Sequence, residues 1–273
     1  MKEIDNLYKD LCYNLIYKGK KVGNTYELRN VKIELNDITE NIVSIRNISH
    51  SYLFAEWIWY FTGKNDVNFI SKFASKWKNI SDDGLTNNSA YGYLIKSAHG
   101  FDQLEKIIEL LQKDPYSRRG VININVPNEN VIETKDEPCT ICLQFYIRDN
   151  KLYCTGMMRS NDIWYGFPYD IAFFTLLQRY TADRLGVEYG SYTHFVTSLH
   201  VYDRNIEDIK NIVYKPIEIP MKYNYKRFFI NLEFVESLLR FSTIHCDSKF
   251  NKQYILHLAK HFFDYKKGEN NED

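Results

Sequence analysis

The sequence predicts a single α/β domain, and three observations support this. The chain has 273 residues, of which 44% are hydrophobic and 16% aromatic, enough to bury one large core. Segments with the apolar spacing of helices are interspersed with segments that alternate like strands. Its prolines and glycines are scattered, and no repeat with a period of about 20–50 residues is visible. We expect residues 1–265 to form one domain and the polar residues 266–273 to be a loose tail.

Four segments have helical periodicity, namely residues 49–62, 102–113, 170–185 and 251–263. In the third, Asp170 predicts a capped start and Gly186 a stop. Strand-like alternation marks residues 120–126, 139–148 and 151–158. Asp149 and Asn150, between the last two, predict a hairpin turn.

Composition narrows the class of protein. Lysine plus arginine number 35 and aspartate plus glutamate 35, so no overall charge favours nucleic acid or a membrane surface. The most apolar run, residues 52–61, is interrupted by Glu56 and is shorter than the roughly 20 residues of a membrane span. The N-terminus lacks an apolar signal core, and five cysteines without a framework spacing predict a reducing, cytoplasmic location.

Cys139 stands out among the cysteines. With Cys142 it forms a CxxC, which raises the alternatives of a redox pair or half of a zinc site. The redox motif needs a helix start, whereas these residues open a strand, and no second ligand pair follows at metal spacing. Cys139 follows Pro138 at the strand entrance, and Arg159 lies on the neighbouring hairpin strand, where a guanidinium lowers a thiol pKa. We expect Cys12, Cys142, Cys154 and Cys246 to be buried hydrophobes.

Ordered motifs from Cys139 to Tyr202 resemble the thymidylate synthase family. They comprise Cys139, Gln144-Phe145-Tyr146, Arg159-Ser160-x-Asp162, Gly166-x-Pro168-Tyr169-Asp170-Ile171-Ala172 and His200-Val201-Tyr202, with Glu56-Trp57-Ile58-Trp59-Tyr60-Phe61-x-Gly63, Tyr91-Gly92 and Pro115-x-Ser117-Arg118-Arg119 upstream. The resemblance implies a thymidylate synthase-like fold, with a mixed sheet, packed helices and an obligate homodimer. Its motifs are specific for ancestry but do not define the substrate.

The resemblance also implies roles for individual residues. Cys139 would be the nucleophile, Glu56 would transfer protons and order water, and Tyr91 would lie near the C5 proton. Arg159 and Ser160 would bind the nucleotide phosphate, with Arg118 and Arg119 reaching it from the partner subunit, since guanidinium forks suit a phosphate dianion. Asp162 and Trp77 would contact the folate, and His200 and Tyr202 the sugar 3′-hydroxyl.

Glu56 and Tyr91 also have ordinary interpretations. Glu56 lies among apolar residues, so burial would raise its pKa, and the alternative is an exposed position on an imperfect helix. Tyr91 is one of 22 tyrosines, so its role depends on the resemblance alone.

The chain departs from the family pattern in several places. The N-terminal loop offers lysines instead of an arginine, so Lys20 or Lys21 is a candidate substitute. Thr140 and Asn205 each replace a frequent histidine. The polar C-terminus, residues 268–273, does not resemble the hydrophobic closing peptide of methyl-transferring members, which is consistent with water reaching the site.

Asp170 stands where uracil-specific members of the family carry Asn, and this indicates a cytosine substrate. A carboxylate accepts from the cytosine N4 amino group and from a protonated N3, but it cannot donate to uracil O4. An unmatched buried polar group costs about 1–3 kcal/mol. The alternative, that Asp170 only caps its helix, does not explain why the residue is an acid, since Asn would cap equally well.

These observations predict an enzyme that transfers a one-carbon unit from 5,10-methylenetetrahydrofolate to C5 of dCMP or CMP. In the family, the cysteine thiolate adds to C6 and makes C5 nucleophilic. Water then gives a hydroxymethyl product, and hydride a methyl product. The alternatives are methyl or hydroxymethyl transfer to dUMP and, in another class, a nucleotide-binding protein without catalysis. The choice between ribose and deoxyribose stays open.

Overall fold

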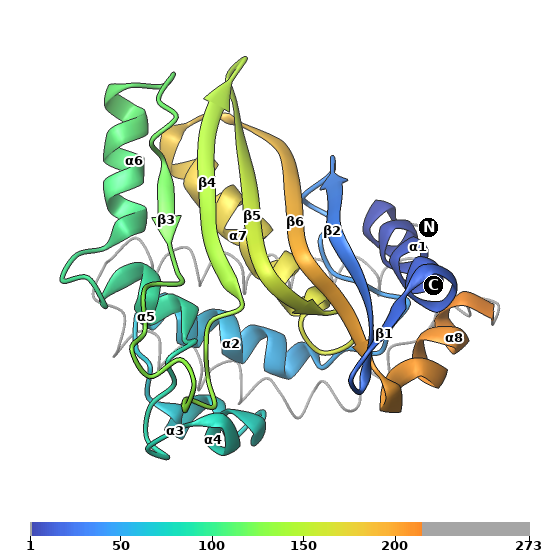
Figure 1. Ribbon diagram of the computed structural model, residues 1–273. Helices are drawn as coiled ribbons and strands as arrows, with labels where there is room; N and C mark the ends of the chain where they lie inside the picture. Colours follow the sequence, from blue (N-terminus) through green and yellow to red (C-terminus); the bar gives the residue numbers. More distant parts are fainter. Residues whose placement is uncertain (1, 215–273) are drawn as a thin grey trace, which may run out of the picture.

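The computed structural model describes residues 2–214, which build a six-stranded sheet with helices against one face and around its edges (Figure 1). The strand order is β1-β2-β6-β5-β4-β3. Their bounds are β1 Lys20–Val22, β2 Thr25–Leu35, β3 Val121–Asn123, β4 Thr140–Arg148, β5 Lys151–Asp162 and β6 Glu188–Tyr202. β5 and β6 run parallel, and the other neighbouring strands are antiparallel. The sheet is therefore mixed, as the sequence predicted.

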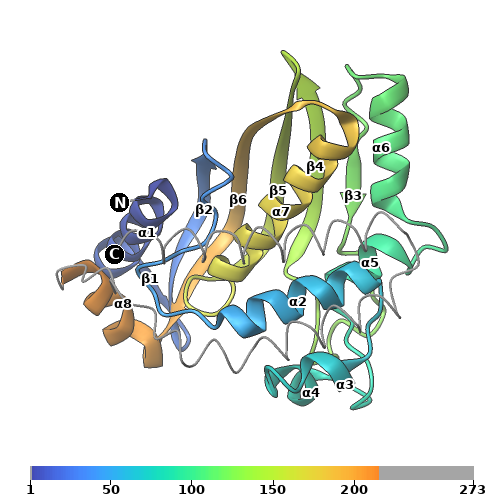
Figure 2. The same ribbon diagram turned by 180° about the vertical axis from the view of Figure 1, so that it is seen from behind.

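The helices occupy one face of the sheet and its edges. α7, Phe167–Leu185, connects β5 to β6 and lies across the back of the sheet, and α2, His50–Thr62, runs beneath it (Figure 2). The remaining bounds are α1 Glu3–Lys18, α3 Val67–Ile70, α4 Lys76–Ile80, α5 Tyr91–Lys96, α6 Gln103–Lys113, the 3-10 turn η1 Asp203–Asn205 and α8 Ile206–Tyr214. Much of the core lies between α7 and the sheet, and most residues of α7 are buried. No helix in residues 2–214 combines the length and the apolarity of a membrane span.

Three of the predicted helices are present, with one correction at the site. α2 and α6 begin after Ser49 and Asp102, whose side chains accept hydrogen bonds from backbone amides of the first turn. α7 begins at Phe167 with Gly166 as its N-cap, so Asp170 lies within the first turn and does not cap the helix. The capped start predicted at Asp170 was wrong because Pro168 already starts the helix. The predicted helix 251–263 lies outside the described residues.

The hairpin between β4 and β5 is confirmed. Asp149 and Asn150 have φ values of 49° and 57°, as a type I′ turn requires. The predicted strand at 120–126 is shorter, Val121–Asn123, and that at 151–158 extends to Asp162. β6, with fifteen residues, was missed, because its many small polar residues weaken the apolar signal.

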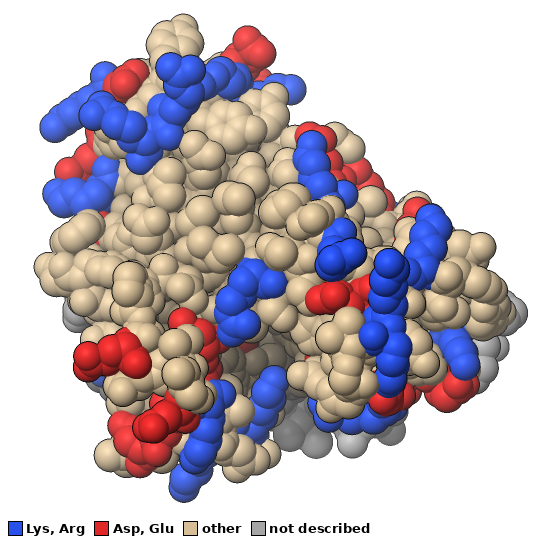
Figure 3. All heavy atoms as spheres, in the orientation of Figure 1, with Lys and Arg blue, Asp and Glu red and all other residues tan. Residues whose placement is uncertain are grey.

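Within residues 2–214, helices cover one face of the sheet and leave the other face uncovered. Leu143, Phe145 and Leu152 point toward α7 and are buried. Tyr146, Tyr153, Thr155, Met157 and Phe195 lie on the opposite face, which we call the open face. Tyr146 and Tyr153 stack there, with ring centroids 5.5 Å apart. In Figure 3 the middle of this side is largely uncharged, lysines and arginines gather toward the top, where α6 and the hairpin end, and charged residues of both signs lie along the right and at the bottom.

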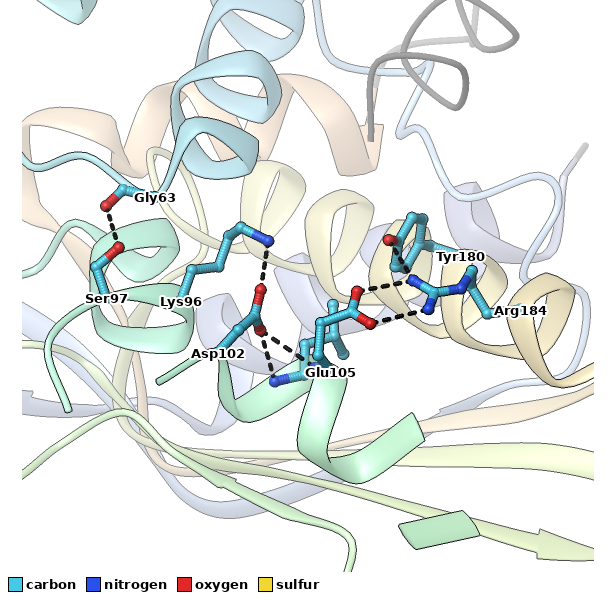
Figure 4. Close-up of polar contacts among 8 residues, drawn as sticks. Gly63, Lys96, Ser97, Asp102, Glu105, Tyr180 and Arg184 are labelled. Atoms are coloured by element: carbon cyan, nitrogen blue, oxygen red, sulfur yellow. Dashed lines mark hydrogen bonds and ion pairs between the residues drawn. The ribbon is translucent and has the colours of Figure 1, made fainter. Parts of the chain in front are cut away.

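A polar cluster ties α5, α6 and α7 together (Figure 4). Arg184 of α7 forms two hydrogen bonds to Glu105 of α6, at 2.7 and 2.8 Å. Asp102 caps α6 and also pairs with Lys96 of α5 at 2.6 Å. The Arg184 hydrogen bonds hold the pKa of Glu105 below its ordinary value, against the opposing effect of partial burial. The cluster fixes the C-terminal end of α7, whose N-terminal end carries Asp170.

We expect Glu105→Gln to lower the free energy of unfolding at neutral pH by about 1 kcal/mol, because it removes a partly buried, two-pronged ion pair. A lowered carboxyl pKa stabilises the fold above the unfolded pKa, and this contribution is lost as the pH falls through the folded pKa. The difference between variant and wild type should therefore narrow below about pH 4. Urea unfolding at several pH values measures it.

Glu109→Gln is the matched control, because Glu109 pairs with Lys106 on the exposed side of the same helix. Its effect should stay below about 0.5 kcal/mol. Equal effects of the two substitutions at every pH would contradict the stabilising role of the Arg184–Glu105 pair.

Candidate functional site

The candidate site lies where β4 begins and β5 ends, beside the N-terminal end of α7. Cys139 directly precedes β4, and the amide of Arg159 on β5 donates to its carbonyl at 2.9 Å. Because the two strands are neighbours in the hairpin, they bring Cys139 and Arg159 together although twenty positions separate them in the sequence. The Cys139 side chain is half-buried, as an attacking group in a cleft needs to be.

Cys139 differs from the expectation in its protonation. Burial raises the pKa of the thiol, and the nearby Arg159 charge offsets this only in part. The Arg159 guanidinium is turned to the backbone, donating from Nε to the Pro138 carbonyl at 3.0 Å and from Nη2 to the Glu137 carbonyl at 2.9 Å. Burial thus outweighs the guanidinium, and the expected net lowering of the thiol pKa was wrong.

The other cysteines within residues 2–214 are also free thiols. Cys12 and Cys154 are buried, as predicted. Cys142 faces the open side of the sheet beside Met157 and is half-exposed, because a β-bulge separates it from Thr140. Cys246 lies outside the described residues.

Glu56 projects from α2 and is 5% exposed. The Tyr52 hydroxyl donates to its Oε1, and Trp77 Nε1 donates to the Tyr52 hydroxyl at 3.0 Å. Burial raises the Glu56 pKa to about 8, although the hydrogen bond from Tyr52 opposes the shift. The carboxyl group is therefore protonated at neutral pH. The expectation of a buried glutamate with a raised pKa is confirmed, and the exposed alternative is wrong.

Asp170 lies in the first turn of α7 and is held from β5. Asn161 Nδ2 donates to its Oδ2 at 2.7 Å, and the Tyr91 hydroxyl of α5 also hydrogen-bonds to it. Burial raises the pKa of Asp170 to about 7, and the Asn161 hydrogen bond is the largest opposing effect. Near neutral pH, both the protonated and the ionised form of this carboxyl group are therefore accessible.

Tyr91 connects the three reactive groups. It is 7% exposed, and the charges of Asp170, Cys139 and Glu56 all raise its hydroxyl pKa, after the larger effect of burial. Lys76 of α4 is an exposed cation that was not among the predicted site residues. Its charge partly offsets the rise that burial causes in the pKa values of Glu56, Asp170 and Cys139. The structure thus places a thiol, two carboxyl groups and a phenol close enough for each to affect the pKa of others, with a cation nearby; we call this cluster the pocket.

A second group of predicted residues lies at the ends of β5 and β6. Ser160 Oγ is 3.5 Å from His200 Nδ1, and the rings of His200 and Tyr202 have centroids 5.4 Å apart. Asp162 accepts from the amides of Trp164 and Tyr165 at 2.8 and 3.3 Å, so its Oδ1 caps the turn before α7. All four side chains are half-buried and present polar atoms beside the pocket.

The two lysines of β1 reach the same end of the sheet. Lys20 pairs in register with Glu27, which is itself opposite His200. Lys21 forms an ion pair with Asp203 and lies over the Tyr26 ring at 4.8 Å. Lys20 is therefore the better placed of the two for a phosphate.

Arg118 and Arg119 are not part of this pocket. The amide of Phe145 donates to the Gly120 carbonyl, which places both arginines beside the middle of β4. Phe145 lies six positions after Cys139, which in an extended strand is a distance of about 20 Å. Both residues are exposed.

A buried chain of polar side chains behind Asp170 was not expected from the sequence. Tyr192 and His194 of β6 and Asn161 of β5 are each at most 2% exposed and linked by hydrogen bonds. Nothing in the sequence pattern marks them, because buried polar residues on an alternating strand look like ordinary core positions. Within residues 2–214, no group of three or more metal-ligating side chains could hold a metal ion.

Comparisons with known proteins agree on the family. A family model described as thymidylate synthase matches residues 6–234. A deoxyuridylate hydroxymethyltransferase of Bacillus phage SP01 is 33% identical over 215 residues, which cover 72% of this chain and 56% of that protein. A thymidylate synthase of Mycoplasma pneumoniae is 32% identical over 157 residues, 55% of this chain and 52% of that protein. The chain spans about half the length of these relatives.

A solved structure, the thermostable thymidylate synthase A from Bacillus subtilis, has the same fold. The TM-score is 0.67 at 21% identity, over 79% of this chain and 85% of that chain. The family model covers far more than half of the sequence, and the strand order and site geometry described above lie within the matched residues. The chain belongs to the thymidylate synthase family.

Proposed function

We propose that this chain transfers a one-carbon unit from 5,10-methylenetetrahydrofolate to C5 of a pyrimidine nucleotide, and that the preferred base is cytosine. The observation that carries the proposal is the convergence of Cys139, Glu56, Tyr91 and Asp170, which lie close enough for their charges to affect one another. These groups supply a nucleophile, a proton carrier and a reader of the base edge, which covalent catalysis at a pyrimidine ring requires.

Cys139 attacks C6 of the pyrimidine. A thiolate is needed for this step, and the raised thiol pKa means that little of it is present before substrate binds. Arg159 and Lys76 are the two positive charges that favour the thiolate. Burial strengthens such charge interactions, so the thiolate gains most when the pocket is closed over a substrate.

Glu56 carries protons. Its pKa of about 8 keeps it protonated at neutral pH, and the hydrogen bond from Tyr52 fixes one carboxyl oxygen. A general acid works best when its pKa lies near the operating pH. Trp77 reaches Glu56 only through Tyr52, so a cofactor that contacts Trp77 would also lie close to the proton carrier.

Asp170 reads the base. As a carboxylate it accepts from the exocyclic N4 amino group of cytosine, and as a carboxylic acid it can supply a proton to N3. Its pKa of about 7 makes both forms available near neutral pH. Since Asp170 does not cap α7, helix capping does not account for the acid at this position.

A uracil nucleotide is the second candidate substrate. Two relatives, those of Bacillus phage SP01 and Pseudomonas phage M6, are named deoxyuridylate hydroxymethyltransferase, and the second is 33% identical over 157 residues, 56% of this chain and 45% of that protein. A protonated Asp170 donates a hydrogen bond to uracil O4, which the ionised form cannot do. Under this alternative, uracil turnover falls as the pH rises through the pKa of Asp170.

The residues around the pocket fit a nucleotide and a folate. Arg159, Ser160 and Lys20 supply donors for a phosphate, and His200 with Tyr202 supplies polar groups for a sugar. For the folate, Arg46 lies over the Trp164 ring at 4.4 Å, and its buried Nε and Nη1 have no hydrogen-bond partner within residues 2–214. Trp77, Asp162 and Arg46 would hold the folate, which supplies the methylene carbon.

A second copy of the chain would cover the open face of the sheet. Tyr146, Tyr153 and Met157 make the part of this face over β4 and β5 uncharged and partly apolar, as subunit interfaces are at their centres. Arg118 and Arg119 lie about 20 Å along β4 from Cys139 and cannot serve the pocket of their own subunit. A two-fold related copy can bring them to the other pocket, which supports the expected homodimer.

The assay that tests the proposed function incubates the protein with 5,10-methylenetetrahydrofolate and, separately, dCMP, CMP, dUMP and UMP. We expect a hydroxymethyl group on a cytosine nucleotide, identified by mass spectrometry. A product on dUMP alone would establish the uracil alternative, and absence of product on all four would favour a nucleotide-binding protein without catalysis.

We expect Asp170→Asn to move the preference toward uracil by tenfold or more, because the amide donates to O4 and the lost acceptor no longer matches N4; a mismatch of about 1–3 kcal/mol corresponds to this range. The ratio of kcat/KM for dUMP and dCMP measures the change. An unaltered ratio would show that Asp170 does not read the base.

We expect Glu56→Gln to reduce kcat at least about a hundredfold while nucleotide binding persists, because glutamine has the shape of the protonated acid but cannot transfer its proton. Calorimetric binding and steady-state turnover separate the two effects. The limb of the wild-type pH profile that Glu56 causes should also be absent from the residual activity. Turnover at the wild-type level would exclude Glu56 as the proton carrier.

We expect two inactive variants, Arg119→Ala and Cys139→Ala, to recover activity when they are unfolded, mixed and refolded together. A mixed dimer has one pocket with an intact Cys139 and an intact Arg119 from the other chain, which gives about a quarter of wild-type activity for random pairing. Refolding each variant alone is the control. If the mixture is as inactive as its components, the pocket is not shared between subunits.

A further inference from the structure

A directed series of hydrogen bonds runs through the core to Asp170. The Tyr192 hydroxyl is 3.0 Å from His194 Nδ1, and His194 Nε2 is 3.2 Å from Asn161 Oδ1. Asn161 Nδ2 is 2.7 Å from Asp170 Oδ2. Tyr192, His194 and Asn161 are 0%, 1% and 2% exposed, so bulk water cannot replace these partners.

The Asp170 carboxylate, at the end of the series, determines which group is the donor in each hydrogen bond. Asp170 Oδ2 faces the amide group of Asn161, and only the NH2 side of that amide can donate to a carboxylate. Asn161 Oδ1 then needs a donor, which is His194 Nε2–H, and His194 Nδ1 is left to accept from the Tyr192 hydroxyl. All three donors thus point toward Asp170.

Two glycines provide the space for this arrangement. A Cβ atom at Gly166 would lie 2.8 Å from Asn161 Nδ2 and 3.1 Å from Asp170 Oδ2. A Cβ atom at Gly156 would lie 2.3 Å from the Tyr192 hydroxyl oxygen. The lack of a side chain at Gly166 and Gly156 therefore leaves room for the hydrogen-bonded groups at both ends of the series.

We propose that Asn161, oriented by His194, is a positioning residue that fixes Asp170 Oδ2 as a hydrogen-bond acceptor and leaves Oδ1 as the oxygen that gains or loses a proton. The base-reading consequence rests on the proposed function: the proton on Oδ1 decides whether the pocket offers a donor or an acceptor to the pyrimidine edge. Asn161 thereby sets the pH at which the pocket changes its base preference.

His194 suits this task because it does not titrate with Asp170. Burial lowers the pKa of His194 to about 4, so the ring stays neutral and keeps one N–H on Nε2 through the neutral range. Its hydrogen-bond partners Tyr192 and Asn161 are uncharged, and the Phe167 ring packs perpendicular to it with the two ring centroids 5.4 Å apart.

The titratable and charged groups that act on Asp170 come from every surrounding element. They are Glu56 and Tyr60 of α2, Lys76 of α4, Tyr91 of α5, Cys139 before β4, Asp162 of β5 and Tyr192 of β6. Of the hydrogen bonds that oppose the effect of burial, that from Asn161 is the largest. Its removal should therefore be visible above the contributions of these neighbours.

The test is a carboxyl titration by NMR of protein labelled with 13C at the aspartate side-chain carboxyl carbon, without nucleotide or folate. The Asp170 signal is assigned by its loss in Asp170→Asn. We expect Asn161→Leu to raise the Asp170 midpoint by about one pH unit, because the ionised form loses a hydrogen bond. A folded Asn161→Leu protein with an unchanged midpoint would overturn the proposal.

Asn41→Leu is the matched control. Asn41 is also a buried amide that holds α7, donating to the Ala172 carbonyl at 3.1 Å and to Thr175 Oγ1 at 2.8 Å, but it does not contact Asp170. It should lose stability and keep the wild-type midpoint. A shift of equal size in Asn41→Leu would show that general loosening of α7 causes the effect.

His194→Phe serves as the second variant and decides the matter should Asn161→Leu not fold. It leaves Asn161 in place but removes the donor that orients it, so the midpoint should rise by less than in Asn161→Leu. An unchanged midpoint would exclude orientation by His194. Since no substrate is present, these results stand even if the four-nucleotide assay yields no product.

With nucleotides, the dUMP to dCMP ratio of kcat/KM, measured against pH, links the positioning to selectivity. The transition in this ratio should move upward in Asn161→Leu by the same amount as the NMR midpoint. If the NMR midpoint of Asp170 shifts but the pH transition of the kcat/KM ratio does not, Asn161 affects the protonation of Asp170 but not the choice of base.

Discussion

The parallel pairing of β5 with β6 is the constraint on which the site depends. Parallel neighbours need a crossover, and α7 provides it across the back of the sheet. The end of β5, the start of α7 and the end of β6 therefore meet at one edge. Arg159 and Asn161 arrive on the first, Asp170 on the second and His200 on the third, so four site residues owe their proximity to one topological feature.

Burial supplies the chemistry at this edge. Glu56 and Asp170 would both be ionised in water at neutral pH, but the pocket raises their pKa values to about 8 and about 7. Two buried carboxylates and a thiolate could not coexist cheaply so close together. Protonation removes that conflict, and Tyr52, Tyr91 and Asn161 supply the hydrogen bonds that the carboxyl groups still need.

Local sequence patterns predicted the parts of the fold that local forces determine. Asp149 and Asn150 adopt left-handed φ values readily, so the hairpin was predictable, as were the helix starts at Ser49 and Asp102. The start of α7 was misplaced by three residues because Pro168 and Asp170 are both plausible near a helix start. β6 was not predicted, since its strand character comes from pairing with β2 and β5 on both sides.

In the site, too, local motifs were predictable from the sequence, whereas features that depend on the tertiary structure were not. The motifs gave Cys139, Glu56, Tyr91 and Asp170, and the structure brings these four together, but their catalytic roles are predictions. The thiol pKa could not be read from the nearness of Arg159, because the orientation of a guanidinium toward Pro138 and Glu137 depends on the folded backbone. Asn161 and His194 could not be linked from the sequence, because they lie on different strands and only the folded structure brings His194 Nε2 to 3.2 Å from Asn161 Oδ1.

The fixed orientation of the Asn161 amide, with Nδ2 directed at position 170, also affects how such a pocket can change its substrate base during evolution. If an amide replaced the acid at position 170, the waiting Nδ2 donor would bind its oxygen and so turn its NH2 group toward the base. No neighbouring residue would have to change. A lineage carrying this framework can therefore alternate between amino- and oxo-pyrimidines through a single codon change, with the direction of the new side chain already prescribed by its surroundings.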